Sequence, residues 1–299
     1  MNGTGWIPIS LNVIAAGAPF SVLPIDPINT TSSGNYYTYV VSGQTYETTT
    51  LFESAKYQAQ EAKDGGVDPA QYESGSSLTL SPFTHGMVGY WKFDEGSGTS
   101  ALDSSLYGNV GVMYSSTTLT DIHTSSGCKV GGCASYNGID NMILAQGGTT
   151  MIPAGGSITV MAWAYKTISG TKTLGHSNGP FFLDMGTVMG GSTEIYNGSA
   201  WGGVVSSQPI STSTWYHLAI TYAASGGRIS NYLNGALDGT GTIAGGVGQA
   251  LSCVGIGYSS NGGCNGVKAG FFGGLIDEFR IYNRALSAAE ILALYNATK

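Results

Sequence analysis

Apolar and polar residues alternate with a period of two over most of the chain. Side chains of a β-strand point alternately to its two faces, so this period predicts strands that each bury one face. The pattern is clearest in four segments rich in β-branched and aromatic residues: 157–166, 214–223, 228–235 and 274–283. Asn-Gly pairs, which favour two-residue hairpin turns, occur between such segments at 137–138, 197–198 and 234–235. The sequence therefore predicts a mostly β protein built as a two-sheet sandwich or jelly roll.

A short helix is predicted at the end of the chain. Ser287 and Glu290 have the spacing of a capping box, in which each residue satisfies a backbone N–H at the start of a helix. The apolar residues of "ILALYN" follow and fall on one helical face.

Composition excludes several classes of protein. Charged residues make up only 10% of the 299 residues, and the net charge is −7. Without a basic surface, nucleic acid is a poor partner. No apolar run reaches the roughly 18 residues of a membrane span, and the opening residues Met1 to Trp6 do not have the pattern of a signal peptide. The 11% of aromatic residues argue for a packed core rather than disorder.

The four cysteines form two local pairs around glycine-bearing turns. Cys128 and Cys133 enclose "KVGG", and Cys253 and Cys264 enclose ten residues. Neither spacing fits a zinc knuckle. Two local disulfides are predicted, with free buried thiols as the alternative. Disulfides are typical of exported proteins, so we expect an extracellular or cell-surface location.

The chain divides into two predicted domains, 1–82 and 83–299. Five of the nine prolines lie in residues 1–80, and "SLTLSPFTHG" at 77–86 has the composition of a linker. The first part is too short for a large core, so a small sheet with long loops is expected there.

The second part resembles laminin-G-like, concanavalin A-like jelly rolls. The matching elements, in the family's order, are "GMVGYWKFDEGSGTSALDSSLYGNVG", "VGGCASYNGIDNMIL", "WYHLAITYAASGGRISNYLNG" and "FFGGLIDEFRIYNRALSAAEILALYN". The resemblance implies a jelly roll of a kind that binds glycans or proteins.

The first part resembles the globular region of type IV pilins and pseudopilins. The resemblance rests on "WIPISL", "SVLPIDPIN", "YYTYV", "YETTTLFES" and "DGGVDPAQYESGSSLTL". It implies a pilus or secretion context, with other pilin subunits as partners. The apolar N-terminal helix of that family is missing, so we expect this chain to be the soluble part of a longer protein that does not form filaments by itself.

Catalytic motifs give no support for an enzyme. Gly175–Gly179 matches G-x-S-x-G, but a nucleophile elbow needs a following helix, and a strand follows here. The Glu-x-Asp-x-Glu triplet of laminarinase-type hydrolases is absent. Asp184 and Glu194 lie on neighbouring predicted strands and could pair, although a solvated pair is the simpler interpretation. The histidines, without metal-ligand spacing, are His85, His123, His176 and His217.

A structural calcium ion is the predicted cofactor. Calcium prefers six to eight oxygen ligands, and related sandwiches often use an ion to join the first loop to the last strand. The candidate ligands at these corners are Asp94, Asp103, Asn109 and Asp277. The alternative is that Asp103 caps a turn and Asp277 accepts backbone hydrogen bonds. Asp64 to Asp68 resembles a calcium loop of some pseudopilins, and turn chemistry explains it nearly as well.

Ligand contacts are predicted where aromatic residues occur in turns. Sugars stack on exposed aromatic faces. Trp201 lies at a hairpin tip with Tyr196 before it, and Tyr107 and Tyr258 stand in Gly/Ser/Asn-rich loops. The tryptophans within strand patterns, predicted to be core residues, are Trp91, Trp163 and Trp215.

Three functions remain open. The first is a non-catalytic surface or pilus-associated protein that presents the jelly roll for adhesion to a glycan or a surface protein. The second is a structural filament subunit without a ligand. The third is a carbohydrate-active enzyme whose site has no recognisable motif.

Overall fold

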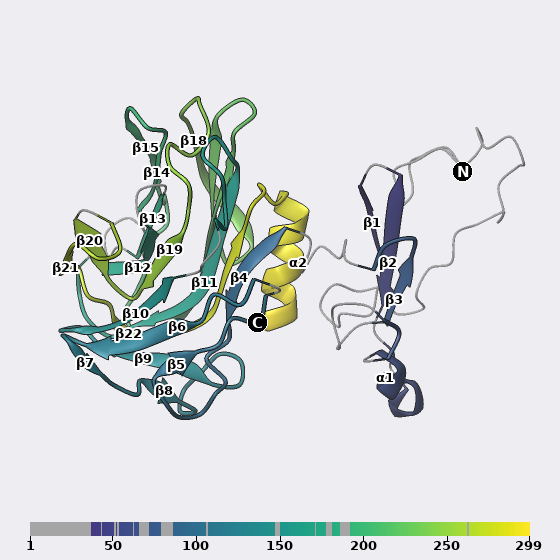
Figure 1. Ribbon diagram of the computed structural model, residues 1–299, viewed down its shortest axis with the longest axis horizontal. Helices are drawn as coiled ribbons and strands as arrows, with labels where there is room; N and C mark the ends of the chain where they lie inside the picture. Colours follow the sequence, from purple (N-terminus) through teal and green to yellow (C-terminus); the bar gives the residue numbers. More distant parts are fainter. Residues whose placement is uncertain are drawn as a thin grey trace, which may run out of the picture. The chain divides into compact units, whose positions relative to one another are not determined.

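The chain folds into two compact units, Met1–His85 and Gly86–Lys299, which are described separately (Figure 1). The sequence predicts the boundary at residue 82. The computed structural model describes residues 37–42, 44–50, 52, 54–61, 63–65, 72–78, 86–105, 107–146, 150–170, 172–177, 181–185, 192–261 and 263–299.

The first unit contains a three-stranded antiparallel sheet of order β1-β2-β3. Its elements are β1 (Thr38–Ser42), β2 (Thr45–Thr50), α1 (Ala55–Glu61) and β3 (Tyr72–Gly75). The ring of Phe52 packs 4.9 Å from that of Tyr72, centroid to centroid. The "LPIDP" element and Asp68 lie outside the described residues. Asp64, at the start of the predicted calcium loop, accepts the backbone N–H of Glu73. The pilin-like fold of this unit therefore stays a prediction.

The second unit contains a nine-stranded antiparallel sheet. Its order is β15-β14-β13-β12-β19-β10-β6-β5, with β7 paired to β6. The strands are β5 (Ser100–Ala101), β6 (Gly111–Ser115), β7 (Thr118–Leu119), β10 (Asn141–Gln146), β12 (Lys172–Ser177), β13 (Phe181–Met185), β14 (Ser192–Tyr196), β15 (Trp201–Val205) and β19 (Cys253–Ile256).

An eight-stranded sheet forms the other layer. Its order is β18-β17-β16-β11-β22-β9-β8, and β4 also pairs with β22. The strands are β4 (Met87–Trp91), β8 (His123–Thr124), β9 (Cys133–Asn137), β11 (Ile158–Lys166), β16 (Trp215–Ala223), β17 (Arg228–Leu233), β18 (Ala236–Thr242) and β22 (Gly273–Tyr282). A separate hairpin consists of β20 (Ser259–Asn261) and β21 (Val267–Ala269).

The core lies between the two sheets (Figure 1). Trp91 and Phe279 are fully buried there, with ring centroids 6.0 Å apart. The other fully buried side chains of this core include Met113, Val160, Ile220 and Ile256. The predicted mostly β jelly roll with a two-sheet architecture is confirmed.

Local predictions of the sequence are also confirmed. Asn234 and Gly235 both adopt positive φ angles, 50° and 78°, in the turn between β17 and β18. Both disulfides form, Cys128–Cys133 and Cys253–Cys264. The C-terminal helix α2 (Ala288–Thr298) begins at Ser287 with a complete capping box to Glu290.

The helix α2 lies against the outer face of the eight-stranded sheet. There Trp163 stacks on Tyr295 at 5.5 Å and donates from Nε1 to the hydroxyl of Thr298 at 2.8 Å. Trp163 is thus buried, but beneath the helix rather than between the sheets, and Trp215 is only half-buried. No helix among the described residues is long and apolar enough to cross a membrane.

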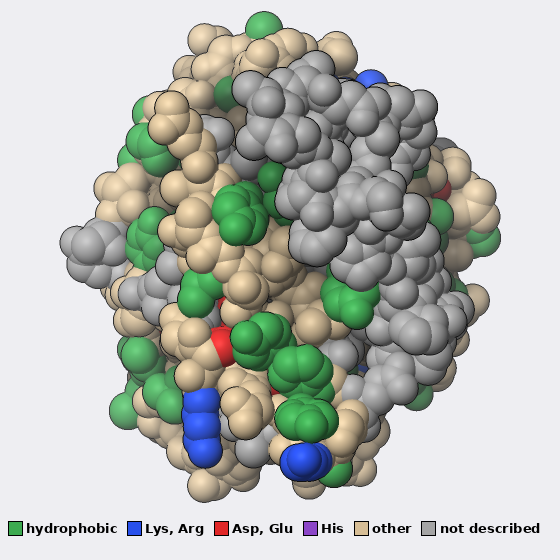
Figure 2. Space-filling model, turned by 90° about the vertical axis from the view of Figure 1, so that its right-hand side faces the viewer, with side chains coloured by type: hydrophobic (Ala, Val, Ile, Leu, Met, Phe, Trp, Pro, Cys, Tyr) green, Lys and Arg blue, Asp and Glu red, His purple; other side chains and the backbone are tan. Residues whose placement is uncertain are grey.

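Charged side chains are scattered thinly over the surface. Figure 2 shows one face of the molecule, where a few blue and red groups stand among tan and green atoms. This agrees with the 10% of charged residues in the sequence.

Candidate functional site

Three aromatic rings form a partly exposed platform at one edge of the nine-stranded sheet. The ring of Trp201 lies 5.2 Å from Phe182 and 5.1 Å from Tyr196, centroid to centroid. Trp201 keeps 46% of its surface exposed, and Phe182 and Tyr196 are half-buried. We call these three residues the Trp201 platform. Their contacts hold the indole in place while one part of it stays open to a ligand.

Strand register brings an acidic side chain to the same face. Phe182 pairs with Glu194 and Glu194 with Gly203, while Tyr196 pairs with Trp201. Residues two apart in a strand share a face, so Glu194 stands on the same face as the rings. Gly203 has no side chain, and a Cβ atom there would lie 3.2 Å from Cγ of Glu194. The platform therefore borders a glycine floor and an exposed carboxylate.

The row of rings continues under a covering hairpin. His176 stacks on Phe182 at 5.9 Å and meets Tyr258 edge-on at 4.6 Å. Tyr258 is fully buried and donates its hydroxyl to the carbonyl of Cys264. The β20–β21 hairpin, held by the Cys253–Cys264 disulfide, thus closes this end of the row. The prediction that Tyr258 contacts a ligand is wrong, because the chain folds back over it.

Burial keeps the covered histidine uncharged. His176 donates from Nδ1 to the carbonyl of Tyr258 at 2.8 Å, and its side chain is inaccessible to solvent. Burial lowers the pKa of His176 to about 4, and the charge of Lys268 adds to this effect. At neutral pH this ring is an apolar member of the row.

Tyr107 does not join the platform. It lies in the loop between β5 and β6, at the edge of the nine-stranded sheet opposite to β15. Its side chain is 43% exposed. Sequence reasoning grouped it with Trp201 on exposure alone, and the strand order separates the two.

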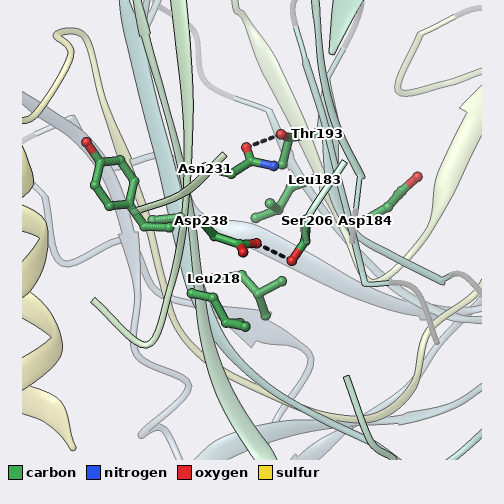
Figure 3. Close-up of a pocket in the computed structure, with 10 residues that line it drawn as sticks. Leu183, Asp184, Thr193, Ser206, Leu218, Asn231 and Asp238 are labelled. Carbon is green, nitrogen blue, oxygen red and sulfur yellow. Dashed lines mark hydrogen bonds between the residues drawn. The ribbon is translucent and has the colours of Figure 1, made fainter. Parts of the chain in front are cut away.

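A polar seam fixes the edge strand that carries Trp201. Asn231 of β17 donates to the carbonyl of Val204 at 3.0 Å and accepts the hydroxyl of Thr193, and Asp238 of β18 accepts the hydroxyl of Ser206. Figure 3 shows these two pairs facing each other across a small pocket, whose lining includes Leu183 and Leu218. We call the four residues Thr193, Ser206, Asn231 and Asp238 the edge seam.

The backbone of β18 also comes very close to that of β15 at this edge. A Cβ atom at Gly241 of β18 would lie 3.0 Å from the carbonyl oxygen of Gly203 and 3.0 Å from Val204. Contacts under about 3.4 Å are tighter than ordinary van der Waals packing. The two sheet edges can meet here because glycine occupies this position.

Asp184 and Glu194 share the face of the platform, as alternation along their strands requires. Burial raises the pKa of Asp184 to about 6; a hydrogen bond to Thr173 opposes the shift and the charge of Glu194 adds to it. Glu194 is exposed. The sequence prediction that these acids can pair is thus compatible with the structure, with one carboxyl sheltered and the other open.

Comparison with known proteins places this sandwich in a family. A model of the concanavalin A-like lectin/glucanases superfamily matches residues 137–292. The chain belongs to this superfamily. The matched region contains the Trp201 platform, the edge seam and Asp277. No curated protein sequence matches the chain significantly.

Solved structures of the same fold include carbohydrate- and receptor-binding domains. Domain 4 of AbnA, an extracellular arabinanase from Geobacillus stearothermophilus in complex with arabinotriose, is 21% identical with a TM-score of 0.52, over 70% of this chain and 98% of that one. The botulinum neurotoxin serotype D binding domain is 14% identical with a TM-score of 0.52, over 71% and 52%. A neurotoxin DC binding domain in complex with rat synaptotagmin II is 11% identical, with a TM-score of 0.51, over 72% and 52%. The chain spans about half the length of these neurotoxin domains.

Outside the platform, the four predicted calcium ligands fall into two pairs, Asp103 with Asn109 and Asp94 with Asp277. Asp103 receives the backbone N–H groups of Tyr90 and Ser105, both at 2.8 Å, and of Asn109 at 2.7 Å. It therefore caps its loop. Asn109 is buried and donates to the carbonyl of Val88. These two predicted ligands are used in holding the first loop.

Asp94 and Asp277 meet at the Cys128–Cys133 loop instead. Asp277 accepts the N–H groups of Lys129 and Val130 at 3.0 and 2.8 Å, and Asp94 accepts that of Gly132 at 2.6 Å. Asp277 is fully buried, and its Oδ1 has no hydrogen-bond partner. Burial raises the pKa of Asp277 to about 7, and the charges of Glu278 and Asp94 add to the shift.

No three His, Cys, Asp or Glu side chains are placed to hold a metal ion together within the described part of the chain. The predicted set of Asp94, Asp103 and Asp277 is therefore not assembled as one site. Oδ1 of Asp277 stays without a hydrogen-bond partner, and the charge of Asp94 acts on the same carboxyl group.

Phe182 and Gly203 were missed by sequence reasoning. The sequence does hold a signal for Phe182, because two consecutive phenylalanines in a strand must place one ring on the outer face. An outer-face phenylalanine next to a hairpin with a tryptophan marks a surface that is either covered or used in binding.

Removing the amide of Asn231 should loosen the edge seam. Asn231→Leu leaves the Val204 carbonyl without its amide donor, and we expect the free energy of unfolding to fall by about 1–3 kcal/mol. Urea denaturation would measure it. Ser207→Ala, which removes only exposed hydrogen bonds, one donated to Asp238 and one accepted from Gln208, is the control and should cost less than about 0.5 kcal/mol. Equal losses in both variants would contradict the role given to the seam.

The raised pKa of Asp277 should make stability depend on pH. The folded state holds this proton more tightly than the unfolded chain does, so the free energy of unfolding should fall as pH rises from about 4 to 7. The raised pKa of Asp184 likewise lowers the free energy of unfolding as pH rises to about 6. Asp277→Asn should therefore flatten the profile between pH 6 and 7, measured by denaturation in chelator. Parallel profiles for the two proteins would refute this.

Proposed function

We propose that the chain is a non-catalytic, extracellular or cell-surface protein whose jelly-roll unit binds a glycan through the Trp201 platform and thereby serves adhesion. The observation that carries this proposal is the 46% exposed indole of Trp201 held between Phe182 and Tyr196, beside the carboxylate of Glu194. C–H groups of sugar rings stack on aromatic faces, and carboxylates accept hydrogen bonds from sugar hydroxyls.

The fold supports a binding role. Solved structures with this fold include a domain in complex with arabinotriose, and a neurotoxin whose cell entry depends on interaction with two ganglioside molecules. Another is in complex with synaptotagmin II, so a surface protein is the other class of ligand that we propose for the jelly roll.

The extracellular setting rests on the two disulfides, which persist in oxidising compartments. The pilin-like sequence of the first unit extends the proposal to a pilus or secretion context, with pilin subunits as partners of the full-length protein. In that context the jelly roll is the part presented to a target surface.

We also propose a structural calcium ion at Asp94 and Asp277. Its support is the buried Oδ1 of Asp277, which has no partner, beside a second carboxylate that interacts with it. A bound cation would coordinate that oxygen and link Asp94, which follows β4, to Asp277 of β22. It would therefore stabilise the folded state.

A hydrolase is the second candidate, and one observation favours it. Asp184, with a pKa near 6, shares the face of the platform with the exposed Glu194. Glycosidases use two carboxyl groups, one as general acid and the other as base or nucleophile. Release of reducing ends from polysaccharides, lost in both Asp184→Asn and Glu194→Gln, would support it.

Glycan binding should depend on Trp201 and not on exposed aromatics elsewhere. We expect Trp201→Ala to weaken binding at least about tenfold, equivalent to about 1.4 kcal/mol, in titrations with glycans identified on an array. Tyr107→Ala removes a ring of similar exposure, 43%, at the opposite sheet edge and should bind normally. Both variants should melt within a few degrees of the wild type. Normal binding by Trp201→Ala would refute the proposal.

Calcium should raise the melting temperature relative to chelator. We expect Asp277→Asn to remove most of this difference. Asp103→Asn should lower the melting temperature in both conditions and keep the difference, because Asp103 caps its own loop. Identical melting of the wild type in calcium and chelator would exclude the ion.

A further inference from the structure

Within the described part of β13, β14 and β15, the charged side chains near Trp201 are all acidic. Gly203 forms the floor of the space beside Trp201, Glu194 stands next to that floor, and Val205 follows on the same strand face with 55% of its surface exposed. The sequences of β13, β14 and β15 contain no lysine or arginine.

Two carboxyl groups act on this space. Glu194 is exposed, and Asp184 lies on the same face, close enough for the charge of Glu194 to raise its pKa. His176 adds no positive charge, because its ring is buried and neutral. The lysine that acts on His176, Lys268, belongs to the β21 strand at the covered end of the row.

We propose that the Trp201 platform selects uncharged glycans over acidic ones, with Glu194 as the residue that excludes sialic or uronic acid groups. This inference rests on the proposed glycan-binding function and specifies the class of sugar. Neutral sugars carry hydroxyl groups that donate to the carboxylate of Glu194 while a ring stacks on Trp201. An acidic sugar brings a second carboxylate that cannot donate and is repelled.

The size of the effect follows from the exposure of Glu194. Repulsion between Glu194 and the carboxylate of an acidic sugar about 6 Å away in water would weaken binding roughly threefold. Asp184, which is ionised at pH 7.5, would bring the effect to about tenfold. Salt screens exposed charges with a Debye length of about 8 Å at physiological ionic strength. Discrimination against acidic sugars should therefore shrink as salt is added, whereas stacking on Trp201 should not.

The test uses the full chain and an array of matched glycan pairs, each a neutral oligosaccharide and its sialylated or uronic acid counterpart. We expect the wild type at pH 7.5 to prefer the neutral members about threefold to tenfold, and less so in 0.5 M salt. Glu194→Gln keeps the shape and removes the charge, and it should bring the two members of each pair closer by about threefold. Trp201→Ala should lose both members.

Two control variants make the outcomes distinct. Glu290→Gln makes the same change of net charge at the start of α2, on the eight-stranded sheet, and should leave the preference unchanged. Lys268→Ala should do the same. Binding that needs Trp201 but is equal for both members of each pair, or unchanged by Glu194→Gln, would overturn this inference and leave the glycan-binding function intact. Absence of binding to every glycan would overturn both.

Discussion

The insertion of the last strand into the middle of the eight-stranded sheet is the interaction on which the sandwich depends. β22 pairs with β11 along one side and with β9 and β4 along the other. It sends Phe279 and Ile281 into the core, whereas Arg280 bonds to Glu278 and Tyr90 within the same sheet. A chain truncated before this strand would leave two half-sheets with exposed edges, so the fold forms only when its two ends meet.

The same strand links the core to the surface loops. Asp277 of β22 collects two backbone N–H groups of the Cys128–Cys133 loop, and Trp163, its pairing neighbour on β11, lies beneath α2. Both α2 and the Cys128–Cys133 loop are therefore connected to the eight-stranded sheet through β22 and its pairing with β11. The Trp201 platform lies on the other sheet, where side chains of β17 and β18 reach across to hold the edge. The Trp201 platform and the contacts of α2 and the Cys128–Cys133 loop thus lie on different sheets.

Local patterns of sequence were sufficient for features made by residues close together in the chain. The alternation, the Asn234-Gly235 turn, the Ser287 capping box and both disulfides each involve short separations. The pairing of Tyr196 with Trp201 belongs to this class, since one hairpin makes it. What failed were predictions that depend on the layer arrangement. Loop composition placed Tyr258 on the surface, and only the folding back of its hairpin shows that it is buried. The predicted ion ligands were grouped by their corner positions, and the structure shows Asp103 accepting backbone N–H groups of Tyr90 and Asn109.

The hairpin that covers His176 and Tyr258 has a consequence for the environment in which this protein can act. The row of rings is longer than its open part, and a covalent link between Cys253 and Cys264 helps to hold the cover. The disulfide therefore helps to set how much of the aromatic row stays exposed. A chain matured in a reducing compartment would lack that constraint on its cover, and the area it presents would no longer be fixed by its sequence alone.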